Sequence, residues 1–399
     1  MAIAIHTPAD SGSTPDRPIA IVPVARLRHA LSTIRKAMPK RRGRSVRPVP
    51  QLVTIQGGII TAGDSHNAGV VTIPLDWNVM HDDTYVVPLD ALVAAAKGAK
   101  GSIAIYADRI MRADGTSITF TVDSDHADAA AVEADYVNAP MPPRTFTLTG
   151  QQWCDLANIV GSHASTDDTR PVLTGIYVSP VAGDGTVDLV ATDSYRLVIT
   201  SVQTGHPQTY THCLIPSRMI SVIASHIAKD PHASVEVHPD ADSVTIRALT
   251  NDPEGDPGDV CTLIVARTRM ISGQYPNYQA LIPDGILRSV TLADDACDRI
   301  ITFARMRRTA VPMRITVEGS TLAVEWEGAE LTVPCHVEGE QDPITFGLNA
   351  GFTADCLAAM PQGGATIGII NPLRPFTFTA ADHSQDYYNV TSIVMPVRI

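Results

Sequence analysis

Apolar positions recur at helical spacing in three segments of the chain, residues 21–38, 148–164 and 292–308. Hydrophobic side chains return every three or four residues in each, which is the period of an amphipathic helix. Thr149 and Asp294–Asp295 stand ahead of the apolar stripe in the last two segments, and these residue types are typical of helix N-termini. We therefore predict one helix in each segment.

A second set of three segments lies roughly midway between the first, at residues 85–108, 213–240 and 345–370. Each reads as an extended apolar stretch, a turn residue, a short amphipathic helix, a break with Gly or Pro, and a strand. Runs such as SITFTVD and SVTIRAL follow, with the period of two expected for half-buried strands. The pattern predicts strand-rich units with two helices each.

Similar extended linkers, EADYVNAPMPP and GQYPNYQALIP, stand where such units would end. The chain therefore reads as three copies of one α+β unit. We expect domains over 19–143, 144–284 and 285–399, after a leader at 1–18 that is rich in Pro, Ser, Asp and Thr and is expected to be disordered.

Composition agrees with a globular chain, because 44 % of the residues are hydrophobic and 18 % are charged. Neither a stretch of about 20 apolar residues nor a secretory signal is recognisable, so an intracellular protein is expected. The six cysteines form no CxxC pair, which favours free thiols over a metal site or a disulfide framework.

The net charge of −12 opposes binding to a polyanion, but the positive charge is unevenly placed. Residues 26–47 hold nine of the 30 Lys and Arg residues and contain no Asp or Glu. Because phosphate contacts are local and screened over about 10 Å, such a segment can bind nucleic acid. A solvated basic loop is the alternative.

Motifs for catalysis are absent: there is no GxSxG, HExxH or GxxxxGK[ST]. Acidic residues gather at 81–83 and at 165–170, but in hydrophilic turns without the spacing of a metal site. We therefore expect no enzyme, no metal and no cofactor. A metal hydrolase using His163, Asp167 and Asp168 is the weaker alternative.

Residues 167–202 predict a β-hairpin, with one strand at 175–181, a Gly-rich turn, and a second strand at 187–202. A polar cluster from Thr192 to Arg196 interrupts the apolar alternation of the second strand. Such a cluster is either a surface kink or a recognition site.

Three motifs, in order along the chain, then carry a family resemblance: Arg170, Leu173 and Gly175 followed by Ala191–Leu197; Gly273–Pro283; and the terminal VMPVRI. They resemble the middle domain, the linker and the C-terminus of the bacterial DNA polymerase III β sliding clamp. The resemblance covers about residues 19–399.

The resemblance implies three clamp-type domains, each with two helices packed on β-sheets, in a head-to-tail homodimeric ring around duplex DNA. Such clamps catalyse nothing. They tether the replicative DNA polymerase, the clamp loader and other proteins, and are cytoplasmic and nucleoid-associated. The strand with Ile118 and Phe120 and the end of the helix at 292–308 are candidates for the dimer seam.

The resemblance also implies functional residues. Basic side chains aimed at DNA would be Arg26, Arg28, Arg35, Lys36, Arg41, Arg42, Arg44, Arg305, Arg307 and Arg308. A pocket between the second and third domains, which captures Gln-x-x-Leu-Phe-like peptides, would consist of Leu173, Thr192, Ser194, Tyr195, Arg196, Leu197, Pro276, Leu281, Asn349, Phe352, Leu373, Ile393, Met395, Pro396, Val397, Arg398 and Ile399.

The chain departs from the family pattern at a few positions of this pocket. Ser194–Tyr195 replaces Gly-His, Ala280 replaces an Arg, Ala310 stands for an aromatic residue, and Val397 replaces the last Met. The preferred peptide is therefore expected to differ from the usual one. A repeat-built structural or interaction protein that does not encircle DNA is the alternative function.

Overall fold

The computed structural model describes residues 18–38, 51–64, 69–75, 78–79, 84–122, 141–142, 146–181, 185–204, 212–252, 260–306, 312–382 and 388–399. The expected leader, apart from Pro18, lies outside these residues. So do Arg41, Arg42, Arg44, Arg307, Arg308 and Ala310. The chain forms two compact units, one of Met1–Cys154 with Arg218–Met270 and one of Asp155–Ser217 with Ile271–Ile399.

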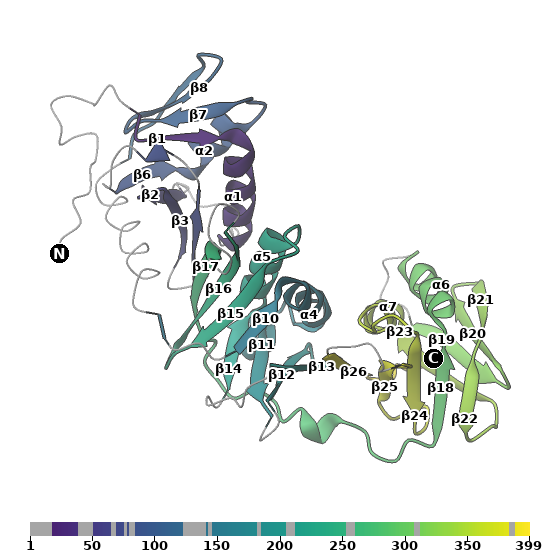
Figure 1. The fold of residues 1–399 in the computed structure, drawn as a ribbon. Coiled ribbons are helices and arrows are strands. Elements are labelled where there is room, and N and C mark those ends of the chain that lie inside the picture. The colour runs from purple at the N-terminus through teal and green to yellow at the C-terminus, as the bar shows by residue number, and fades with distance from the viewer. Residues whose placement is uncertain are drawn as a thin grey trace. The chain divides into compact units, whose positions relative to one another are not determined.

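Two antiparallel sheets build the first unit (Figure 1). The five-stranded sheet has the order β5 (Asn78–Val79), β1 (Ala20–Pro23), β7 (Ser102–Ile105), β8 (Arg109–Arg112) and β9 (Ser117–Thr119). The eight-stranded sheet has the order β10 (Phe146–Thr149), β15 (Ser234–Pro239), β16 (Ser243–Asn251), β17 (Val260–Arg269), β4 (Gly69–Pro74), β3 (Ile59–Asp64), β2 (Leu52–Gln56) and β6 (Tyr85–Pro88).

Two further antiparallel sheets build the second unit. The nine-stranded sheet has the order β14 (Cys213–Pro216), β11 (Gly175–Pro180), β12 (Thr186–Thr192), β13 (Arg196–Gln203), β26 (Tyr388–Val394), β25 (Phe376–Ala380), β24 (Ala365–Ile369), β18 (Arg288–Leu292) and β22 (His336–Gly339). The four-stranded sheet has the order β21 (Ala329–Pro334), β20 (Thr321–Trp326), β19 (Pro312–Glu318) and β23 (Ile344–Asn349).

Six α-helices occur in the described residues, and a helix forms in each predicted segment: α1 (Val24–Ala37), α2 (Leu89–Ala96), α4 (Gly150–His163), α5 (Ser217–Ile227), α6 (Asp294–Arg305) and α7 (Ala350–Ala358). A strand comes directly before each of them, namely β1, β6, β10, β14, β18 and β23. The helix pairs α1 with α2 and α6 with α7 each lie side by side (Figure 1). The expected α+β class is confirmed.

Local side-chain chemistry explains one predicted helix start and corrects the other. Thr149 Oγ1 accepts from the Gln152 amide at 3.2 Å while Gln152 Oε1 accepts from the Thr149 amide at 2.8 Å, a reciprocal capping box before α4. Asp294 does not cap α6, whose N-cap residue is Ala293. Its carboxylate instead accepts from the amides of Gly363 and Gly364.

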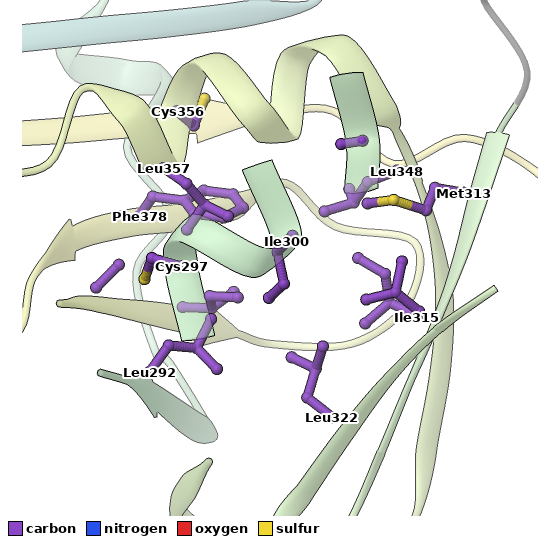
Figure 2. Packing of buried hydrophobic residues seen from close by; sticks show 14 of the residues in the cluster. Leu292, Cys297, Ile300, Met313, Ile315, Leu322, Leu348, Cys356, Leu357 and Phe378 are labelled. Atoms are coloured by element: carbon purple, nitrogen blue, oxygen red, sulfur yellow. The ribbon is translucent and has the colours of Figure 1, made fainter. Parts of the chain in front are cut away.

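One apolar core holds both sheets and both helices of the C-terminal part of the chain together. Ile300 of α6, Leu357 of α7 and Met313 and Ile315 of β19 all belong to this core, in which Leu357 lies beside Phe378 and Met313 beside Leu348 (Figure 2). Phe346 and Phe376 stack with their ring centroids 4.3 Å apart.

All six cysteines are free, and three of them are buried. None of the helices in the described ranges is long and apolar enough to cross a bilayer.

Candidate functional site: an apolar cavity beside the terminal strand

A cavity of about 730 Å³ opens within the second unit, beside β13 and β26. Its wall is mainly apolar, with three charged side chains. It consists of Leu173, Thr192, Ser194, Tyr195, Arg196, Leu197, Pro276, Ala280, Leu281, Ile282, Pro283, Asp284, Ile370, Arg374, Pro375, Ile393 and Met395. A hollow of this size and lining suits a small ligand or a few side chains of a peptide.

Strand pairing sets one wall of the cavity. β13 runs antiparallel to β26 with Leu197 opposite Ile393, although these strands lie almost 200 residues apart in sequence. The Met395 amide continues the ladder by donating to the Tyr195 carbonyl at 2.9 Å. The side chains of Leu197 and Ile393 are buried, at 3 % and 4 % exposure, so they form the buried base of the cavity on this side.

A tight turn separates β12 from β13, where the sequence predicted one strand over 187–202. Asp193 Oδ1 accepts from the amides of Tyr195 and Arg196 at 2.9 and 3.0 Å, which closes the turn. Ser194 has φ +82°, a left-handed conformation that favours glycine. The polar cluster is thus a turn between two strands, and it leaves Tyr195 61 % exposed at the cavity.

The connector at 273–284 forms the facing wall, and two tyrosines fix it to β12. Tyr275 donates its hydroxyl to the Val190 carbonyl at 3.3 Å, and Tyr278 donates to Asp188 Oδ2 at 3.1 Å. Burial raises the pKa of both phenols, with the neighbouring Asp188 also raising that of Tyr278. Gly273 has φ +133°, and a Cβ there would lie 2.6 Å from Val172. The anchored connector leaves Leu281 50 % exposed.

Arg196 joins the cavity to two helices. Its guanidinium donates to Asp193 Oδ2 at 3.0 Å, to Asp355 of α7 and to the Ser162 carbonyl of α4. It also lies 4.4 Å from the centroid of the Phe352 ring. Only 10 % of this side chain is exposed, so Arg196 mainly serves to hold the turn, α4 and α7 together.

The alternative metal-hydrolase site is not assembled. His163 is buried, with Nδ1 at 2.9 Å from the Ile159 carbonyl and Nε2 at 3.5 Å from Cys356 Sγ. Burial, helped by Arg196, lowers the pKa of His163 to about 4. Hydrogen bonds from Thr169 lower the pKa of the exposed Asp167. Across the described ranges, no cluster of three or more His, Cys, Asp or Glu residues is able to hold a metal ion.

The structure brings together ten of the seventeen residues expected in the pocket: Leu173, Thr192, Ser194, Tyr195, Arg196, Leu197, Pro276, Leu281, Ile393 and Met395. It adds Ala280, which was noted only as a departure, and six residues that were not expected: Ile282, Pro283, Asp284, Ile370, Arg374 and Pro375. These additions are close sequence neighbours of expected residues, and that proximity was the available signal.

The other seven expected residues do not line the cavity. The Phe352 ring stacks on that of Tyr195, with the ring centroids 6.4 Å apart. Asn349 caps α7, because its side-chain oxygen accepts a hydrogen bond from the Phe352 amide. Leu373 is 81 % exposed beside the lining residue Arg374, and Pro396 follows Met395 along the chain.

The last three residues, Val397, Arg398 and Ile399, run beside β23 instead of into the cavity. The Val397 amide donates to the Gly347 carbonyl at 2.9 Å. A Cβ on Gly347 would lie 2.4 Å from Ile399 Cγ2, so the absence of a side chain there lets the terminus approach. Ile399 instead lines a separate hollow with Trp326 and Arg314.

The described basic residues expected at DNA have different surroundings. Arg28 donates to the carbonyls of Ala96 and Ala99 and so caps the end of α2. Arg26, Arg35 and Lys36 are exposed along α1. Arg305, at the end of α6, lies 3.6 Å from Asp355 Oδ1.

The fold is the one found in DNA polymerase III beta subunits of known structure. A family model described as DNA polymerase III beta subunit, central domain, matches residues 151–254. A putative beta subunit from Eubacterium rectale has the same fold with a TM-score of 0.75 at 13 % identity, covering 95 % of this chain and 99 % of that one. A sliding clamp from Bartonella birtlesii, bound to griselimycin, gives 0.73 at 17 % identity over 95 % and 99 %.

The proteins that are similar in sequence are β sliding clamps as well. The β sliding clamp of Streptomyces coelicolor is 25 % identical over 276 residues, 65 % of this chain and 68 % of that one. That of Micrococcus luteus is 26 % identical over 314 residues, 74 % and 94 %. That of Streptococcus pneumoniae is 23 % identical over 248 residues, 59 % of each chain, which is less than two thirds of that relative. The chain is therefore similar over most of its length to β sliding clamps, at about 25 % identity, and it has the fold of DNA polymerase III beta subunits.

Proposed function

We propose that the chain is a DNA sliding clamp: a homodimeric ring that encircles duplex DNA without sequence preference and holds replication and repair proteins on it. The observation that carries the proposal is the cavity, because the connector and the terminal strand of a clamp fold form an apolar hollow with half-exposed anchoring residues. The partners would be a replicative polymerase, a clamp loader and other proteins with short apolar motifs. The site of action would be the cytoplasm, at the nucleoid.

The three-domain division into 19–143, 144–284 and 285–399 belongs to this proposal. It is supported by the strand–helix pair that occurs twice in each of these stretches, for example β1–α1 and β6–α2 in the first. The sheets cross the proposed junctions, since β17 pairs with β4 and β13 pairs with β26. Each proposed domain therefore shares a sheet with the next one along the chain.

Dimerisation would use a sheet edge. Within the described residues β9, which contains Ile118, is the last strand of its sheet, and Phe120 directly follows it. An edge strand presents unpaired backbone groups on one side, which a second chain is able to extend. The end of α6 is the proposed partner surface on the other subunit.

Contact with DNA would be electrostatic and independent of sequence, since tight base contacts would stop sliding. The exposed Arg26, Arg35 and Lys36 of α1 support this role. Arg28 is proposed to contribute less, because its guanidinium already binds carbonyls at the end of α2. Arg305 would have to share its charge with Asp355.

Peptide binding tests the cavity assignment. We expect Leu281→Asp to weaken binding of a fluorescent Gln-Ala-Ser-Leu-Phe peptide at least tenfold, because a charge would occupy an apolar wall. Leu287→Asp is the matched control, since Leu287 lies just after the connector, with 49 % exposure against 50 % for Leu281, but does not line the cavity. Fluorescence anisotropy would measure both. Equal affinity of the two variants would contradict the assignment.

A further inference from the structure

The charged side chains of the cavity wall differ in what they are free to bind. The wall carries Arg196, Asp284 and Arg374. Arg196 is already paired with Asp193 and Asp355 and lies against Phe352. Its charge is therefore already compensated by two carboxylates inside the protein.

Arg374, in contrast to Arg196, is exposed and makes no ion pair within the described ranges. It follows β24 in a turn where Asn371 accepts from the amides of Leu373 and Arg374, at 2.9 and 3.3 Å. Pro375 comes next and restricts the backbone of Arg374. The backbone is thus held while the side chain is exposed. Within the described ranges, no carboxylate lies within ion-pair distance of Arg374 or hydrogen-bonds to it.

We propose that Arg374 selects peptides that carry an acidic residue beside their apolar anchors. The inference rests on the proposed function, because it assumes that the cavity binds a peptide. An apolar side chain seated against Leu281 and Met395 brings its neighbours along the peptide to the rim, where Arg374 stands. A carboxylate there would make charge-assisted hydrogen bonds with the guanidinium.

The net charge of the whole protein opposes a preference for acidic peptides. Such a preference, if measured, would therefore point to a local positive partner. The net charge of −12 repels acidic peptides. At physiological ionic strength this repulsion is screened beyond about 8 Å, while a contact pair survives. Tighter binding of an acidic peptide therefore reports a local partner. Asp284, also on the cavity wall, is an acid and is not able to supply that partner.

The test uses the full-length protein and fluorescent peptides derived from Gln-Ala-Ser-Leu-Phe. Asp, Asn or Lys replaces each non-anchor position in turn, including one residue after Phe. At one position at least, we expect the Asp peptide to bind about 3- to 10-fold tighter than the Lys peptide. Arg374→Gln should remove that difference, and Arg374→Glu should reverse it.

A further variant separates a specific pair from a general disturbance. Arg314→Gln removes an arginine beside the separate hollow near Ile399 and should change nothing.

The outcomes also separate this inference from the function on which it rests. If the parent peptide binds but Asp and Lys peptides bind equally, Arg374 has no selective role and the cavity assignment stands. If Arg374→Glu leaves an Asp preference unreversed, the inference is likewise overturned. If no peptide of the series binds at all, the proposed function fails together with the inference.

Discussion

At the scale of single residues, Ser194 shows what this chain has changed in the turn between β12 and β13. The family pattern has glycine there, and Ser194 adopts φ +82°, where a Cβ is strained. Its hydroxyl partly offsets the strain, because Ser194 Oγ accepts from Arg170 Nη1 at 2.9 Å. Compared with glycine, serine at this position strains the backbone but adds a side-chain hydrogen bond between two neighbouring loops.

Substitution at Ser194 separates these two effects. Ser194→Ala removes the hydroxyl and keeps the strain, whereas Ser194→Gly removes both. We expect the Gly variant to be about 1 kcal/mol more stable than the Ala variant, because glycine adopts positive φ without a steric cost. Urea unfolding would measure the difference. Equal stability of the two variants, or a less stable Gly variant, would show that the turn is not strained.

At the scale of elements, neutral histidines lie at the packing contacts of helices. His226 of α5 has its ring 4.4 Å from that of His29 on α1, and its Nδ1 lies 2.9 Å from Thr33 Oγ1. Burial, together with the neighbouring His29, lowers the pKa of His226 to about 4. His163 at the end of α4 has a similarly lowered pKa, with Arg196, Asp355 and Asp193 around it.

Stability should therefore fall with acidification in a defined window. The folded protein keeps both histidines neutral down to a pKa of about 4, while the unfolded chain takes up protons below 6.5. The stabilisation is complete above pH 6.5 and is lost as the pH falls toward 4, on the order of 3 kcal/mol per histidine.

Urea midpoints at pH 7.5 and pH 5.0 would measure this loss, in a range where most carboxylates are still ionised. His163→Gln and His226→Gln do not titrate, so each variant should show a smaller drop than the parent protein. A drop of the same size in the double variant would place its origin elsewhere.

At the scale of the whole molecule, the chain's local patterns predicted its helices but not the order of its strands. The helices are recognisable in the sequence because each one buries a stripe of apolar residues at helical spacing, such as Leu27 and Ile34 of α1. The β13–β26 pairing joins residues almost 200 positions apart, and no local period encodes such a partner. Alternation identifies strands, and long-range packing decides their neighbours.

The same distinction applies to the candidate site. The family resemblance indicated residues within recognisable motifs, such as Leu173, Leu197 and Met395, and these line the cavity. Arg374 was not expected, because its turn resembles an ordinary solvent loop. Val397 was expected at the pocket from its position after Met395, but its backbone bond to Gly347 directs the terminus along β23.

Topological retention on DNA tests the central claim most directly. The protein would be loaded on nicked circular plasmid by its host's clamp loader and then gel-filtered in salt that removes surface-bound protein. A ring should stay with circular DNA and be lost when a restriction enzyme linearises the plasmid, and sedimentation should give a dimer near twice 42.6 kDa. Equal retention on circular and linear DNA, or a strict monomer, would contradict the account.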